Sequence, residues 1–175
     1  MSTEKMSKSK GNLVTVNSLI ENFDPDSIRY YFTFNNPEKK DSIFSFEDFV
    51  AIHNKHLVGG YGNFVNRNLA FLSKKFEGKL PKLELDEKIE SEVAATYQEV
   101  GNLITKGELK AAMTRLYNYI QFANRYYDQT TPWVLAKTDL KEFNKVTSNC
   151  IYMIANMANL YEPILPKHAE IIKKL

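Results

Sequence analysis

Apolar residues recur every three or four positions along most of this chain, and this spacing constrains the fold more than any other feature. Three stretches show it clearly, at about residues 86–106, 108–128 and 139–161. In the first, the apolar positions are Ile89, Val93, Tyr97, Val100 and Ile104. An α-helix places residues with this spacing on one face, which must pack against another element. No alternating pattern typical of a strand occurs, so we predict an all-α fold, a helical bundle of four or five helices with short connections.

Turn and capping residues divide the remainder into further helices. After a short amphipathic stretch at residues 16–23, Asp24 and Pro25 are suited to the N-cap and first position of a helix that ends near Pro37. A linker at residues 78–85 follows a longer helix that is described next. Near the C-terminus, prolines at 163 and 166 interrupt the pattern, and a short helix is expected to close the chain.

The longest helix is predicted at residues 46–76, with Ser45 as its cap. Its middle contains Gly59, Gly60 and Gly62, and each glycine costs about 1 kcal/mol relative to alanine inside a helix. Three such residues together indicate either the close approach of another backbone or a break in the helix. The sequence leaves both possibilities open.

Composition excludes several classes of protein. The chain has 175 residues, 43% of them hydrophobic, and a formal charge of +2, so any nucleic acid must be recognised by a local patch rather than by bulk charge. The single cysteine, Cys150, excludes an internal disulfide and is expected to be a buried, inert thiol. We find no apolar run of about 20 residues and no signal-peptide pattern, which predicts a cytoplasmic protein without a membrane partner.

The most specific motif lies near the N-terminus: Lys5, Met6, Ser7, Lys8 and Ser9, followed by Lys10-Gly11-Asn12. Lysines on a loop of small residues can surround a phosphate chain with cationic donors, although charge alone would favour a basic tail. The string is identical to the KMSKS signature that class I aminoacyl-tRNA synthetases share. That resemblance implies a flexible loop that binds ATP, in which Lys8 steadies the pyrophosphate during attack on the α-phosphate.

A second string narrows the resemblance. Residues 57–68, LVGGYGNFVNRN, resemble the first long helix of the anticodon domain of methionyl-tRNA synthetases. Asn63 and Arg67 are four residues apart and share a helix face, where an amide and a guanidinium can read a base edge and hold a phosphate. Taken without the family, this pair would be an ordinary polar surface pair.

A third string surrounds the only tryptophan. Pro132 is predicted to begin a helix with Trp133 in its first turn, where an indole can remain partly exposed and stack on a base. Without context, a buried core tryptophan would be the simpler interpretation. In the methionyl-tRNA synthetase family this tryptophan stacks on the first anticodon base, C34, so the resemblance implies that Asn63, Arg67 and Trp133 bind the anticodon CAU.

The resemblance covers nearly the whole chain and implies a division into residues 1–40, the KMSKS loop and linking segment, and residues 41–175, the anticodon-binding domain. The implied function is recognition of tRNA(Met), both initiator and elongator. The parent enzyme would join methionine to tRNA with ATP and Mg²⁺, using an upstream catalytic domain. This chain lacks the HIGH signature and the zinc-binding cysteines of some relatives. We therefore expect a C-terminal fragment with no catalytic residue, no cofactor and no activity of its own.

Other interpretations remain at this stage. A free-standing, noncatalytic tRNA-binding paralogue would also keep the anticodon domain, but it would have no use for an intact KMSKS loop. Leucyl-, isoleucyl- and valyl-tRNA synthetases share that loop and a helical bundle, whereas residues 61–68 and Trp133 disfavour them. A helical scaffold with coincidental motifs is a third alternative. His53 and His56 have a spacing that could hold a metal, but only Asp48 is near enough in sequence to assist, so no metal site is predicted.

Overall fold

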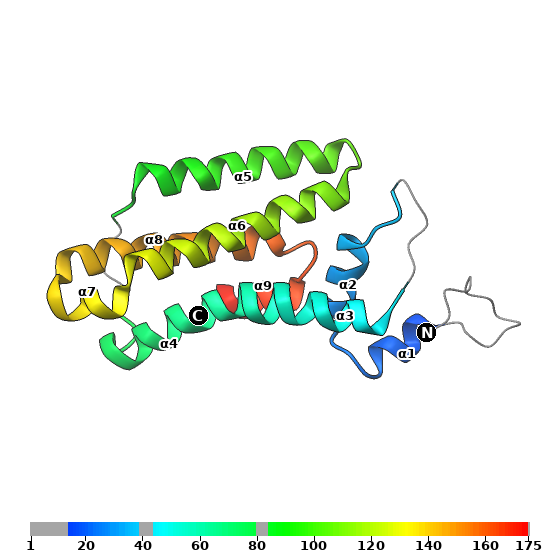
Figure 1. Ribbon diagram of the computed structural model, residues 1–175, viewed down its shortest axis with the longest axis horizontal. Helices are drawn as coiled ribbons and strands as arrows, with labels where there is room; N and C mark the ends of the chain where they lie inside the picture. Colours follow the sequence, from blue (N-terminus) through cyan, green and yellow to red (C-terminus); the bar gives the residue numbers. More distant parts are fainter. Residues whose placement is uncertain (1–13, 39–43, 80–83, 175) are drawn as a thin grey trace, which may run out of the picture.

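The computed structural model describes residues 14–38, 44–79 and 84–174, except for the side chain of Lys75. Within those ranges every regular element is a helix, which confirms the all-α prediction (Figure 1). None of these helices is both long enough and apolar enough to span a membrane. The predicted KMSKS loop, Lys5 to Ser9, lies outside the described residues.

Ten helical segments follow one another in the described chain. The N-terminal part contains α1 (Val16–Ile20) and α2 (Pro25–Phe34). One continuous rod is formed by α3 (Phe46–Ile52), the π-helical segment η2 (His53–Gly62) and α4 (Asn63–Phe76). The remaining helices are α5 (Glu87–Thr105), α6 (Leu109–Thr130), α7 (Pro132–Thr138), α8 (Leu140–Tyr161) and α9 (Pro166–Lys173). The predicted boundaries of the rod, α5, α6 and α8 agree with these to within two residues, whereas α1 and α2 each end about three residues before the predicted end.

The rod from residue 46 to residue 76 confirms the predicted long helix and decides what its glycines do. Ser45 caps it, since its hydroxyl accepts a hydrogen bond from the Asp48 amide at 3.3 Å. The helix does not break at the glycines but widens into η2. A Cβ on Gly60 would lie 3.2 Å from Cγ2 of Ile120, so a side chain of α6, rather than another backbone, approaches the rod there.

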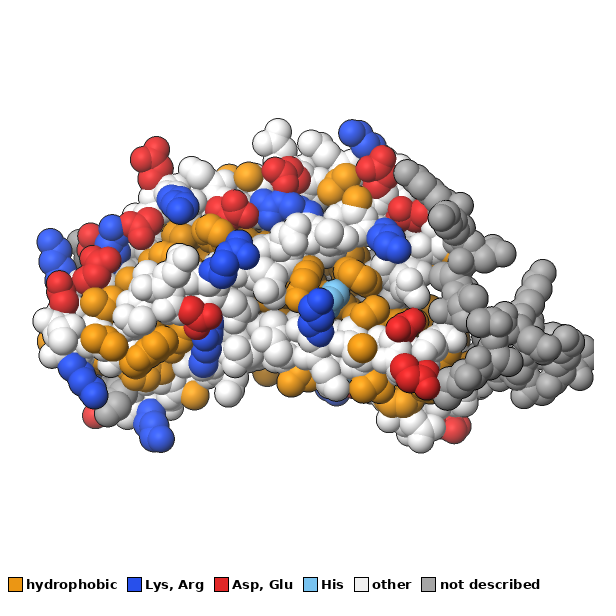
Figure 2. All heavy atoms as spheres, in the orientation of Figure 1, with side chains coloured by type: hydrophobic (Ala, Val, Ile, Leu, Met, Phe, Trp, Pro, Cys, Tyr) orange, Lys and Arg blue, Asp and Glu red, His pale blue; other side chains and the backbone are white. Residues whose placement is uncertain are grey.

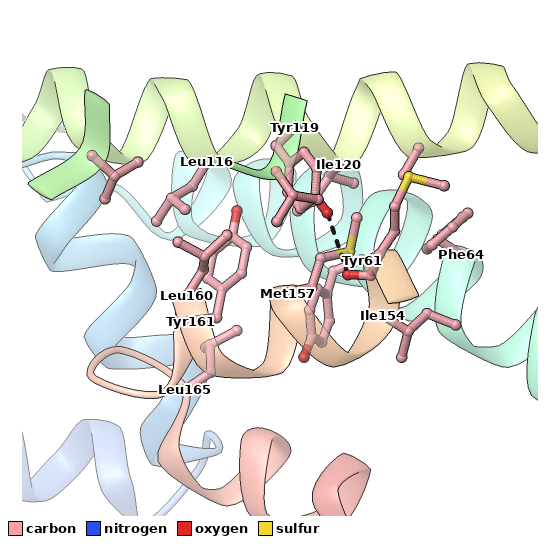
Figure 3. Close-up of a cluster of buried hydrophobic side chains, with 14 of the residues drawn as sticks. Tyr61, Phe64, Leu116, Tyr119, Ile120, Ile154, Met157, Leu160, Tyr161 and Leu165 are labelled. Atoms are coloured by element: carbon pink, nitrogen blue, oxygen red, sulfur yellow. Dashed lines mark hydrogen bonds between the residues drawn. The ribbon is translucent and has the colours of Figure 1, made fainter. Parts of the chain in front are cut away.

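The bundle is built from the rod, α5, α6 and α8, which lie lengthwise along the molecule in Figure 1. Their apolar faces meet in one core, where Tyr61 and Phe64 of the rod lie near Ile120 of α6 and Met157 of α8 (Figure 3). The hydroxyl of Tyr119 donates to the Met153 carbonyl at 3.5 Å, so even this buried phenol has a partner. Cys150 is buried as predicted, and burial raises the pKa of its thiol.

The N-terminal helices have a smaller core of their own and are fastened to the C-terminal end of the chain. Leu19, Ile28, Tyr31 and Phe49 form this second cluster. Arg29 of α2 donates to the carbonyls of Pro163 and Ile164, at 2.8 and 3.3 Å, just before α9 begins. These bonds link α2 to the segment that leads into α9.

Asp24 and Asp26 add two further links between α2 and α9. The carboxylate of Asp26 accepts from the backbone amide of His168 at 3.0 Å and lies 2.7 Å from its ring Nδ1. Asp24 occupies the predicted N-cap position of α2, but its side chain pairs with Lys167 at 2.9 Å instead of capping the helix. Both carboxylates at the start of α2 therefore bind α9.

Candidate nucleic-acid interface

Arg67 lies on α4, and its side chain is turned onto α6 rather than into solvent. Nη1 donates to Asp128 at 2.6 Å, and Nη2 donates to both the carbonyl and the side-chain oxygen of Asn124 at 3.0 Å. The guanidinium carbon is 4.1 Å from the centroid of the Tyr127 ring, within cation–π range. Only 22% of the side chain is exposed, so these contacts fix the position of the guanidinium before any ligand arrives.

Trp133 stands beside this arrangement with an accessible indole. Its ring centroid is 5.6 Å from that of Tyr127, and the indole residue is 43% exposed whereas Tyr127 is buried. Burial raises the pKa of Tyr127, so its ring remains a neutral phenol beside the arginine. Figure 2 shows hydrophobic side chains at the surface of the α7 end of the molecule, bordered by charged side chains of both signs.

A sharp turn between α6 and α7 produces this placement. Thr131 has a φ of 43°, a left-handed conformation that is rare for a β-branched residue. Pro132 follows at the first position of α7, as predicted, and puts Trp133 in the first turn. The turn directs the indole back toward the end of α6, where Tyr127 lies.

Asn63 lies one helical turn before Arg67, and it is exposed. Its amide makes no hydrogen bond with any residue that the structure describes, so both its donor and its acceptor are available. Asn66 is exposed as well, whereas Asn68 is buried and donates to the Phe64 carbonyl at 2.7 Å. Asn68 is therefore a packing residue, while Asn63 and Asn66 face solvent.

The structure thus brings Arg67 and Trp133 to the same aromatic ring, with Asn63 a turn away along α4. We call Asn63, Arg67, Tyr127 and Trp133 the aromatic–arginine face. The sequence did not single out Tyr127, Asn124 or Asp128, which hold Arg67 in place. The only sequence signal for these partners was Arg67 itself, which has no acidic residue one helical turn away. Asp128 lies 61 residues along the chain, so helical spacing could not pair it with Arg67.

The outer side of the bundle has a different character. Arg115 of α6 bonds both Glu92 and Glu99 of α5, so its charge is neutralised within the bundle. Lys145 of α8 pairs with Asp86, just before α5. The exposed acidic residues of α5 leave a surface that repels a polyanion.

Metal-binding geometry among the described residues is limited to one group. Asp24, Asp26 and His168 each place a potential ligand atom within 4.8 Å of the others. These atoms are engaged in pairs, Asp26 with His168 and Asp24 with Lys167, which accounts for the cluster as a link between helices. His56 does not point to a ligand either: its Nδ1 lies 3.0 Å from the Tyr30 hydroxyl, and its ring stacks on Tyr117 at 3.8 Å.

Comparison of the chain with known proteins shows which family it belongs to. Residues 79–175 match the family described as the anticodon binding domain of methionyl tRNA ligase. The chain belongs to this family. Residues 1–69 also match the class I tRNA synthetase family of the methionyl type. These matches decide between the synthetase families that the sequence left open, in favour of the methionyl one.

Individual relatives agree with this assignment. A methionine–tRNA ligase of Bacillus cereus strain 03BB102 is 41% identical over 169 residues, which are 97% of this chain and 31% of the relative. A methionine–tRNA ligase of Bacillus anthracis strain A0248 is 40% identical over the same lengths. Methionyl-tRNA synthetase of Mycobacterium tuberculosis, solved with methionyl-adenylate bound, is similar in structure with a TM-score of 0.91 and 26% identity. That alignment covers 98% of this chain and 35% of the solved one. The chain thus spans about a third of its relatives.

Proposed function

We propose that this chain recognises the CAU anticodon of tRNA(Met), initiator and elongator alike, as part of a methionine–tRNA ligase. One observation carries the proposal: Trp133, the only tryptophan of the chain, packs against Tyr127 and is still partly exposed, and the Tyr127 ring also contacts Arg67. An accessible indole next to a fixed cation is suited to an unstacked nucleobase. The anticodon loop of tRNA offers such bases.

The residues of the aromatic–arginine face have different proposed roles. Trp133 stacks on C34, and such stacking contributes about 1 to 3 kcal/mol per base. Asn63 offers a free amide, which can donate to and accept from the edge of a base. Arg67 already donates to Asp128 and Asn124, and its Nε is buried, so its main role is to hold Tyr127 and the neighbouring indole in place while the second N–H of Nη1 reaches the RNA.

The same proposal extends to the whole ligase. Residues 41–175 would form the anticodon-binding part, and residues 1–40 would connect it to an upstream catalytic domain. ATP with Mg²⁺ would bind at Lys5, Met6, Ser7, Lys8 and Ser9, which lie outside the described residues. Since the chain spans about a third of its relatives, methionine activation would require the other two-thirds, and this chain alone is expected to be inactive.

The proposal is tested by titrating the chain, at one fixed moderate salt concentration, against a CAU anticodon stem-loop and a loop with C34 replaced. Salt must be fixed because phosphate contacts make RNA affinity depend steeply on ionic strength. We expect a clear preference for CAU that Trp133→Ala abolishes. Val134→Ala is a matched control, since Val134 is exposed on α7 to a similar degree but has no aromatic ring to stack on a base. Equal binding to both loops would overturn the proposal.

A further inference from the structure

A cavity of about 690 Å³ opens between the rod and α9. Its walls are mainly apolar, with aliphatic side chains from Leu57, Val58, Val65, Leu69, Leu165 and Ile172. Ser27, Asn63 and Asn66 add polar side chains, whereas Arg67, Tyr127 and Trp133 do not line the cavity. The cavity therefore meets the aromatic–arginine face only at Asn63. A volume of this size with mainly apolar walls is typical of small-molecule sites in proteins.

Two buried polar atoms belong to residues that line this cavity and have no hydrogen-bond partner in the described part of the chain. They are the hydroxyl of Tyr61 and Nδ1 of His53. Tyr61 is only 4% exposed, and it packs among the core side chains shown in Figure 3. A buried polar group without a partner costs about 1 to 3 kcal/mol, so most such groups in proteins are satisfied. Both atoms are closed to solvent, so a small rotation of the Tyr61 ring would bring its hydroxyl to a ligand in the cavity, which would supply the missing partner.

The protonation state of Tyr61 defines what that ligand must offer. Burial, together with the negative charge of Asp26, raises the pKa of its phenol. The hydroxyl therefore keeps its proton at neutral pH and can donate it to an acceptor. A carbonyl or ether oxygen is such an acceptor and carries no net charge.

The π-helical segment explains why these residues share one wall. A π-helix has a wider turn than an α-helix, and η2 contributes His53, Leu57, Tyr61 and Gly62 to the cavity. A Cβ at Gly62 would lie 3.0 Å from the Leu57 carbonyl oxygen, so this widened turn favours glycine there. Segments of π-helix are rare and occur frequently at functional sites.

The charges around the cavity neutralise one another. His168 lines it, but its Nδ1 is bonded to Asp26, and the nearby Asp24 is paired with Lys167. No other charged side chain lines the cavity among the residues that the structure describes. A charged ligand would therefore lose its hydration without gaining a partner.

We propose that this cavity is a binding site for a small, uncharged and mainly apolar molecule whose carbonyl or ether oxygen accepts a hydrogen bond from Tyr61. The aliphatic walls bind the apolar body, and the hydroxyl selects for the oxygen. The site shares Asn63 with the aromatic–arginine face, but Arg67, Tyr127 and Trp133 lie outside its lining.

Two probes of nearly equal shape test the site: acetophenone, which carries a carbonyl oxygen, and ethylbenzene, which does not. Each is titrated into the ¹⁵N-labelled chain while amide shifts are followed by NMR. We expect saturable shifts at Leu57, Tyr61, Leu69 and Ile172, with acetophenone binding roughly fivefold more tightly, as one net hydrogen bond implies.

Two variants make the test decisive. Tyr61→Phe removes only the hydroxyl and should abolish the preference for acetophenone while ethylbenzene still binds. Ile171→Trp places an indole at the mouth from an exposed position of α9 and should block both probes without disturbing the fold. Dispersed amide spectra show whether each variant is folded. The proposal is overturned if neither probe gives saturable shifts at these residues, or if folded Tyr61→Phe keeps the preference.

Discussion

The rod and α6 meet at two places, and the two contacts differ in what they leave accessible. At the first, Gly60 packs against Ile120, and His56 stacks on Tyr117 while its Nδ1 meets the Tyr30 hydroxyl. We call this the closed contact. At the second, Arg67 bonds to Asn124 and Asp128 and covers Tyr127, and Trp133 stays 43% exposed beside it.

The first contact between the rod and α6 only packs the two helices together, whereas the second also leaves side chains accessible for recognition. The closed contact joins polar atoms to one another inside the protein, and a side-chain link to the second contact is Asn124, whose Nδ2 donates to the Gly60 carbonyl at 3.2 Å. Substitution in the closed contact is therefore expected to alter mainly stability. The aromatic–arginine face uses the same kinds of residue, yet it leaves an indole and an amide available to a ligand. Arg67 belongs to both categories, because it fastens two helices and also positions the accessible residues.

Arg67→Ala is expected to have the largest effect, since it acts on both properties. Loss of the charged hydrogen bonds to Asp128 and Asn124 should lower the free energy of unfolding by about 2 to 3 kcal/mol. It should also weaken binding of the CAU stem-loop. Urea denaturation and RNA titration measure the two effects separately.

Two variants serve as controls for Arg67. Arg67→Lys keeps the charge but cannot bridge Asp128 and Asn124 in one plane, so it should recover little of either loss. Asn63→Ala removes an exposed amide and should weaken RNA binding with less than about 0.5 kcal/mol of destabilisation. If Asn63→Ala were as destabilising as Arg67→Ala, Asn63 could not be distinguished from Arg67 as a residue that contacts RNA without holding the helices together.

Gly60→Val is expected to have the next largest effect and to act mainly on stability. Its Cβ would lie 3.2 Å from Cγ2 of Ile120, so the branched side chain must displace the Ile120 side chain at a cost of about 2 kcal/mol. Urea denaturation measures this loss, and the RNA affinity of the folded fraction should be unchanged. A variant that is fully stable but has lost RNA affinity would contradict the separation of the two contacts.

His56 provides an effect that is absent at neutral pH, a pH dependence of stability confined to the closed contact. Burial, helped by the charge of Lys55, lowers the pKa of His56 to about 4 from an ordinary value of 6.5. Between these values the unfolded chain binds the proton more readily than the folded one. Stability should therefore be complete above about pH 6.5 and decline as the pH falls toward 4.

Denaturation at several pH values measures this decline, with His56→Gln as the matched variant. The variant should be less stable at neutral pH, but it should lose less additional stability between pH 6.5 and 4.5. Identical pH profiles would show that His56 does not titrate in this way. RNA binding at pH 7 should be similar in both proteins.

Much of this architecture follows from local sequence patterns. Capping by Ser45 and the prolines at the starts of α2, α7 and α9 mark where helices begin, because their effects act within one turn. Periodic apolar residues identify the core faces for the same reason. The family motifs point to Asn63, Arg67 and Trp133 without any structural information, and of these the structure leaves Asn63 and Trp133 exposed and Arg67 largely covered.

The contacts between distant segments could not be predicted in this way. The partner of Arg67 is Asp128, and the partner of Asp26 is His168, pairs that depend on how helices pack rather than on spacing. Nor did the three glycines reveal whether the rod breaks, since a π-helical segment and a break have the same local signature. The cavity beside α9 likewise arises only when the rod and α9 are both in place.

The most direct test of the proposed interface uses the intrinsic fluorescence of Trp133, because it is the only tryptophan in the chain. The CAU stem-loop is titrated into the protein, and its binding is followed in parallel by the anisotropy of labelled RNA. If Trp133 stacks on the anticodon, its fluorescence is quenched along the same saturation curve, and a loop with C34 replaced requires a much higher concentration. Binding of the CAU loop without any change in Trp133 fluorescence would contradict this stacking.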